Sequence, residues 1–73
     1  MVCLAITNSI NSQIDLIKCD SLDEAKKKMC VTYSFFLKVL DFDENNTFID
    51  TDNNYAQIAN GLEVFEMRIG IAN

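Results

Sequence analysis

The chain contains no histidine, and its 73 residues include only two glycines. Histidine is the side chain that most often transfers protons near neutral pH. Its absence argues against general acid–base catalysis and against a cysteine nucleophile activated by an imidazole. Gly61 and Gly70, the two glycines, cannot form a glycine-rich phosphate loop. We therefore expect a protein that is not an enzyme.

Long apolar runs and paired cysteines are also lacking. No apolar run approaches the ~20 residues of a membrane span, and residues 1–6 are too short and uncharged for a signal peptide. Cys3, Cys19 and Cys30 are odd in number and widely spaced, which is typical of buried free thiols and not of a disulfide framework. A zinc site has no histidine or close cysteine pair to build on. We expect a cytoplasmic protein that has no membrane partner, no metal and no cofactor.

Positive charge is scarce in the second half of the chain. Residues 1–38 carry five lysines against four acids, whereas residues 39–73 carry seven acids against Arg68 alone, and the whole chain has a net charge of −5. Proteins that bind a phosphate backbone depend on Lys and Arg, so direct nucleic-acid binding is not expected. The acidic half instead predicts a basic protein partner.

Residues 21–40 have the clearest helical pattern. Ser21 and Glu24 have the spacing of a capping box, in which the glutamate reaches back to the Ser21 N–H. An apolar stripe follows at steps of three and four residues. Residues 31–40 are also rich in β-branched and aromatic types, so a short helix running into a strand is an alternative. The stripe consists of Leu22, Ala25, Met29, Tyr33, Phe36 and Leu40.

The remaining segments predict β-hairpins around this helix. Residues 2–7 and 13–19 form the first hairpin, with 2–7 central in the sheet. Asn60-Gly61 predicts a second, with a type I′ turn that places Ala59 opposite Leu62. We expect one small domain over residues 1–73, of the α+β class: a two-layer ββαββ fold, with a four-stranded, mainly antiparallel sheet and one helix packed on one face. The predicted core face of the second hairpin is Ala56, Ile58, Phe65, Met67, Ile69 and Ile71, and the other face is Tyr55, Gln57, Val64, Glu66 and Arg68.

Residues 41–54 form a long acidic connection, in which residues 47–49 are expected as a short strand or anchor. Residues 41–52 resemble the calcium loop of the EF-hand family, and residues 36–40 resemble its entering helix. Asn46 stands in place of the turn glycine and Asp52 in place of the bidentate glutamate, and Asn60-Gly61 interrupts the exiting helix. The ligands that the resemblance implies are Asp41, Asp43, Asn45, the Thr47 carbonyl and Asp52.

The leading hypothesis is a non-enzymatic interaction protein that binds a basic protein surface. In general character it resembles inhibitors encoded by phages and mobile elements, including anti-CRISPR proteins that mimic nucleic-acid charge. The alternatives are a structural module that self-associates, for example as a homodimer, and an EF-hand-like calcium-binding module. A Val–Phe pair on the far side of the helix is a second candidate contact surface. The predicted partner-binding residues are Asp41, Asp43, Glu44, Asp50, Asp52, Tyr55, Glu66, Val31 and Phe35.

Overall fold

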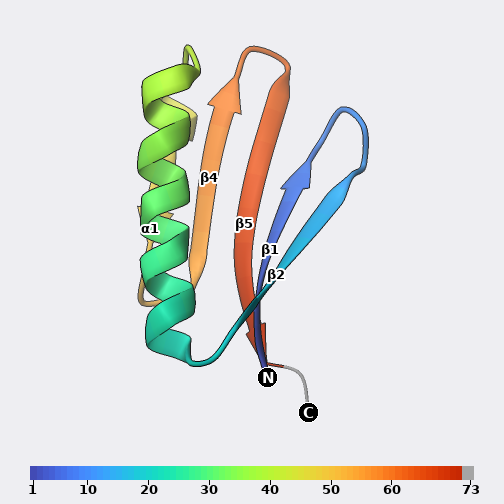
Figure 1. Cartoon of the computed structure of the whole chain (residues 1–73). Coiled ribbons are helices and arrows are strands. Elements are labelled where there is room, and N and C mark those ends of the chain that lie inside the picture. The colour runs from blue at the N-terminus through green and yellow to red at the C-terminus, as the bar shows by residue number, and fades with distance from the viewer. Residues whose placement is uncertain (72–73) are drawn as a thin grey trace.

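One helix lies against one face of a five-stranded sheet (Figure 1). The computed structural model describes residues 1–71. The strand order is β2-β1-β5-β4-β3, and every neighbouring pair is antiparallel. The α+β class and the single helix are confirmed, whereas the predicted four strands are wrong because the sheet has a fifth. The elements in chain order are β1 (Val2–Asn8), β2 (Ile14–Cys19), α1 (Leu22–Val39), the 3-10 turn η1 (Glu44–Asn46), β3 (Phe48–Asp50), β4 (Tyr55–Asn60) and β5 (Glu63–Ile71).

Helix α1 is continuous, as the apolar stripe predicts, and residues 31–39 do not form a strand. Ser21 is its N-cap, and the Ser21 hydroxyl accepts a hydrogen bond of 3.1 Å from the Glu24 N–H. The Glu24 carboxylate accepts a hydrogen bond of 3.2 Å from the Asp20 N–H, whereas the capping box predicts the Ser21 N–H as the donor. This bond and the neighbouring Lys28 lower the pKa of Glu24. The cap thus fixes where the helix begins.

The first hairpin forms as predicted, with β1 in the interior of the sheet. β1 pairs with β2 on one side and with β5 on the other. Leu4 is fully buried, while Ile6 and Ile17 pack against the core from the same face. Strand β1 therefore joins the two hairpins into one sheet.

The second hairpin has a different turn from the predicted one. The two loop residues are Gly61 and Leu62, because Asn60 pairs with Glu63 and Ala59 with Val64. Gly61 has a φ of +61°, the glycine position typical of a type II′ turn. The pairing is shifted by two residues from the predicted register. Since side chains alternate with a period of two, this shift leaves every residue on its predicted face.

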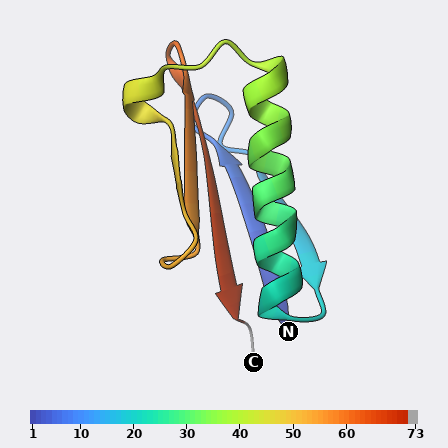
Figure 2. The same ribbon diagram turned by 90° about the vertical axis from the view of Figure 1, so that its left-hand side faces the viewer.

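Residues 41–54 contribute the strand that the predicted four-stranded sheet lacks. After α1 the chain passes through η1 and then forms β3, which pairs with β4 at the edge of the sheet (Figure 2). Ile49 lies opposite Ala56 and packs against the core, so burial of this side chain holds a strand of only three residues. A hydrogen bond from Thr47 also holds this segment against β4, because the Thr47 hydroxyl accepts from the Ala59 N–H at 3.1 Å.

The core lies between α1 and the sheet. Ala25 of α1 is fully buried, and a cluster of five further fully buried side chains comes from four elements: Leu4, Met29, Ala56, Ile58 and Met67. Phe65 and Ile69 pack against them, as predicted for their face of β5. The assignment of Ile71 to the core is wrong, because it is 70% exposed at the end of the described part of β5. The opposite face of the sheet carries no helix among residues 1–71.

Candidate functional site

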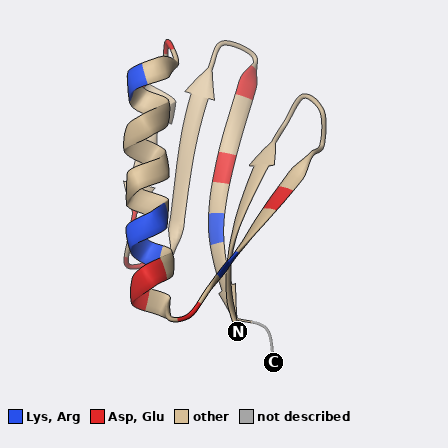
Figure 3. Cartoon of the chain, in the orientation of Figure 1, with Lys and Arg blue, Asp and Glu red and all other residues tan. Residues whose placement is uncertain are grey.

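Five of the predicted partner-binding acids lie along one side of the molecule, which we call the acidic edge. It consists of the carboxylates before β3, at the last residue of β3 and after β3, and it has no Lys or Arg between residues 41 and 54. Figure 3 shows that the basic residues lie on α1, β2 and β5. Strand β3 is the last strand of the sheet, so these acids border the solvent. The acidic edge comprises Asp41, Asp43, Glu44, Asp50 and Asp52.

Two acids of this edge shape the backbone. The Asp43 carboxylate accepts from the Asn45 N–H at 3.0 Å and from the Asn46 side-chain amide at 2.8 Å, which caps η1. Asp50 accepts equivalent bonds from Asn53, at 3.2 and 2.6 Å. These bonds from Asn53 lower the pKa of Asp50 and keep it charged. Each acid–asparagine pair therefore holds a turn and also fixes a negative charge at the surface.

The other three acids have no such bonds. Asp41, Glu44 and Asp52 are exposed, and their carboxylates make no hydrogen bond or ion pair with the part of the chain that the structure describes. Their charge is not neutralised by any lysine or arginine of residues 1–71. A partner with lysine or arginine side chains could bind these three carboxylates without first breaking a hydrogen bond within the chain.

Tyr55 and Glu66 lie next to this edge, on the sheet face that α1 does not cover. Tyr55 is opposite Asp50 on one side and Arg68 on the other. The Tyr55 hydroxyl lies 2.7 Å from the Glu66 carboxylate and 2.8 Å from the Gln57 side-chain oxygen. The Arg68 guanidinium lies 2.8 Å from Glu66 and 5.1 Å from the centre of the Tyr55 ring. Glu66 is thus already paired, unlike the free acids of the edge.

The environment of Tyr55 favours its neutral phenol. Burial, followed by the hydrogen bond and the negative charge of Glu66, raises the pKa of Tyr55 to about 12. Arg68 acts in the opposite direction but is the smallest of these influences. The phenol therefore stays protonated at neutral pH and can serve as a hydrogen-bond donor.

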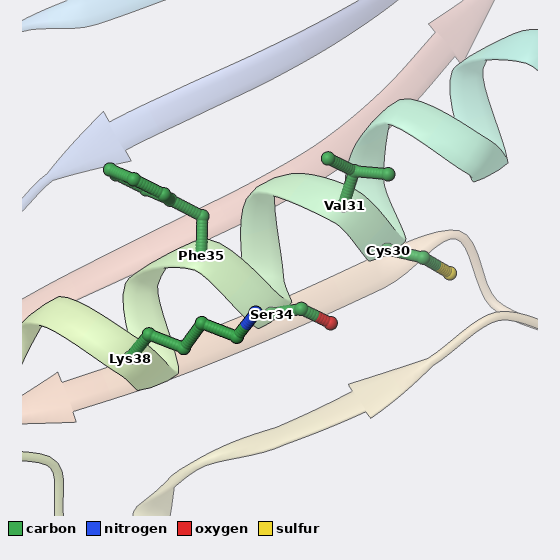
Figure 4. Close-up of a pocket in the computed structure, with 5 residues that line it drawn as sticks. All are labelled: Cys30, Val31, Ser34, Phe35 and Lys38. Atoms are coloured by element: carbon green, nitrogen blue, oxygen red, sulfur yellow. The ribbon is translucent and has the colours of Figure 1, made fainter.

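Val31 and Phe35 form a separate surface on the outer side of α1. Val31 is 69% exposed and Phe35 56%, and Val39, four residues further on, is 58% exposed. Figure 4 shows Val31 and Phe35 projecting from one side of the helix, while the Lys38 side chain extends along the helix toward Ser34. The stripe belongs to α1, which covers one face of the sheet, whereas Tyr55 and Glu66 lie on the other face, so the two surfaces are not continuous.

The predicted residues therefore fall into three groups, and some neighbours were missed. The acidic edge adjoins the Tyr55–Glu66 cluster through Asp50, while the helix stripe stands apart. Phe48 was missed, although its ring lies 5.7 Å from that of Tyr55 and it is 46% exposed. Val39 was missed too, although its spacing of four from Phe35 places it on the stripe. The pairing of Arg68 with Glu66 could have been expected from their spacing of two on one strand.

The segment that resembles a calcium loop has a different architecture here. An EF-hand loop connects two helices, whereas residues 48–50 and 55–60 are paired strands. Asp43 and Asp50 direct their carboxylates to Asn45, Asn46 and Asn53. Within residues 1–71 no three Cys, Asp or Glu side chains are grouped so that they could hold a metal ion. The EF-hand resemblance therefore ends at the sequence pattern.

Within residues 1–71 no helix has both the length and the apolar character needed to cross a membrane. Comparison with known proteins found no matching family model, no similar curated protein and no similar solved structure.

Proposed function

We propose that this chain is a non-enzymatic, cytoplasmic interaction protein that binds a basic protein surface through the acidic edge. The observation that carries the proposal is the run of five acids and no Lys or Arg in residues 41–54, placed along one edge of the sheet. Three of these carboxylates have no internal partner among the described residues. Long-range attraction of opposite charges would steer a basic partner to this edge.

The neighbouring open face supplies groups that an acidic patch alone would lack. Tyr55 and Phe48 present aromatic rings next to the carboxylates. Tyrosine is common at the centres of interfaces because it combines apolar area with a polar tip. We infer that the carboxylates govern encounter and that the two rings provide contact area once the partner is bound.

The class of partner that fits best is a protein whose basic groove binds nucleic acid. Carboxylates on a rigid edge can occupy sites that otherwise bind phosphates, because Arg and Lys recognise both groups. This would make the chain an inhibitor, in the manner of phage and mobile-element inhibitors. Competition with nucleic acid is the signature of that mechanism.

The test is a pull-down from host lysate with three tagged chains. One is unchanged, and one has the free acids of the edge neutralised by D41N, E44Q and D52N. The third, the matched control, has the same change in net charge through D20N, D23N and E63Q, which lie outside the edge and outside β2. Recovered proteins are identified by mass spectrometry at low salt and at about 1 M salt, where the Debye length falls to ~3 Å.

We expect basic proteins that are recovered at low salt by the unchanged chain and by the control, and that are lost with the edge variant. Nucleic acid added to the recovered partner should displace the chain. Equal loss with both variants would mean that net charge, and not this edge, causes binding. Recovery that is indifferent to salt, or recovery of no basic protein, would refute the proposal.

A further inference from the structure

Strand β2 is a long, open edge at the opposite side of the sheet from β3. It spans six residues, Ile14–Cys19, and among the described residues 1–71 it pairs only with β1 (Figure 1). Natural proteins usually protect such an edge by a short strand, a proline, a bulge or several charges. Here there is no proline, and Ile14 and Leu16 are 61% and 68% exposed. The β3 edge, in contrast, has only three residues.

The pairing with β1 shows which backbone groups of β2 point outward. Near the start of β2, the Asn8 N–H donates to the Gln13 carbonyl at 3.3 Å. In an antiparallel ladder the hydrogen-bonded pairs alternate, so Asp15 and Ile17 bond inward to Ile6 and Leu4. The N–H and C=O groups of the residues between them face away from the sheet. These outward residues are Ile14, Leu16 and Lys18.

We propose that this edge binds the β2 edge of a second copy of the chain, giving an antiparallel pair and one continuous ten-stranded sheet. A two-fold axis at Leu16 places Leu16 opposite itself, Ile14 opposite Lys18, and Asp15 opposite Ile17. An axis at Asp15 would instead bring two carboxylates face to face, which is unfavourable. The axis at Leu16 gathers the exposed Ile14 and Leu16 side chains of both copies on the open face.

Charge complementarity favours a second copy as the occupant. In this register, Asp15 of one copy lies opposite Ile17 of the other on the face that α1 covers. Ile17 lines a groove together with Lys27, Lys28, Val31 and Thr32. Lys28 is paired with Glu24 at 3.2 Å, whereas Lys27 is exposed. In this arrangement Asp15 of each copy lies at the groove of the other copy, where it can pair with that copy's Lys27.

The area of contact sets the expected strength. One strand from each copy forms a contact smaller than the ~800 Å² per partner of a standard interface. We therefore expect a weak dimer whose population depends on protein concentration. Light scattering and sedimentation over about 10 to 500 µM should show the mass rise from 8.3 kDa toward twice that value. A mass of 8.3 kDa over the whole range would overturn the proposal.

Two lysine variants test which surface associates. Leu16→Lys places two positive charges opposite each other at the axis and should weaken dimerisation about tenfold or more. Phe35→Lys is the matched control, because Phe35 is also exposed but lies on the outer side of α1, and it should leave the dimer unchanged. The reverse pattern would assign the interface to the helix stripe and overturn the β2 proposal. Amide exchange should show that both variants keep the fold.

A charge exchange tests the register. Asp15→Lys and Lys27→Asp should each weaken the dimer roughly threefold, as for an exposed ion pair. The double variant should restore the association of the unchanged chain, because the opposite charges are again placed across the interface. Failure of the double variant to restore it would refute this register. These measurements use the purified chain alone, so their outcome does not depend on the basic partner proposed for the acidic edge.

Discussion

The replacement of Met29 by alanine tests the architecture on which both proposed interaction surfaces depend. Met29 is fully buried at the centre of the core, in a cluster with Leu4, Ala56, Ile58 and Met67. Truncation removes the apolar transfer energy and leaves a cavity that the packed neighbours fill only in part. Buried methionine-to-alanine changes cost about 2 to 5 kcal/mol. We expect about 3 kcal/mol here.

This loss is large for so small a domain. At ~0.05 to 0.15 kcal/mol per residue, 73 residues give a free energy of unfolding of roughly 4 to 11 kcal/mol. A loss of 3 kcal/mol should lower Tm by about 12 to 24 °C, since each kcal/mol shifts a domain of this size by about 4 to 8 °C. Urea denaturation followed by circular dichroism gives the free energy, and a thermal scan gives Tm.

Val31→Ala is the matched control on the same helix. Val31 follows Met29 by two residues and is 69% exposed, so its truncation should change the free energy of unfolding by no more than ~0.5 kcal/mol. Met29→Leu conserves volume and should cost less than about 1.5 kcal/mol. If Val31→Ala destabilised the protein as much as Met29→Ala, the outer side of α1 would be buried. The assignment of the helix faces would then be refuted.

Two further outcomes follow from local contacts. In a Tyr33→Phe background, absorbance of the ionised phenol should give a Tyr55 midpoint near pH 12 that moves down in the added Glu66→Gln variant. Because the raised pKa favours the folded state, this stabilisation is complete below about pH 10 and is lost as the pH rises through about 12. A midpoint near 10 in the parent background would contradict both the burial of Tyr55 and its contact with Glu66. Ser21→Ala should cost about 1 kcal/mol by removing the N-cap of α1, and Ser21→Asp, which keeps a capping oxygen, should restore most of it in urea denaturation.

The local pattern of the chain was sufficient to predict most individual elements. Helix α1 begins at the predicted cap because the Ser21 hydroxyl accepts from the Glu24 N–H, which has no backbone partner within the first turn, and the Glu24 carboxylate binds the Asp20 N–H just before the helix. It continues to Val39 because the apolar stripe keeps its phase, despite residues that also favour strands. The faces of β4 and β5 were predicted as well, although Ile71, on the predicted core face, is 70% exposed. Because side chains alternate between the two faces of a strand, a register shift of two residues leaves each side chain on the same face.

The prediction was less complete where contacts join distant parts of the chain. The sequence alone indicated a short strand or anchor near Ile49, but only its position opposite Ala56 makes β3 the edge of the sheet. Likewise, the acids of residues 41–52 could be counted from the sequence. Which of them hold turns and which remain unpaired depends on the placement of Asn45, Asn46 and Asn53.

The amino-acid sequence by itself determined the helix, the alternation of the strands and the separation of charge between the two halves of the chain. These properties depend on neighbours a few residues apart, and short-range physical rules describe them. Only the tertiary structure decided that β5 lies between β1 and β4, because that choice depends on pairing residues more than fifty positions apart. The same pairing leaves β2 at one edge of the sheet and the acids at the other, which are the two surfaces that we propose as binding sites.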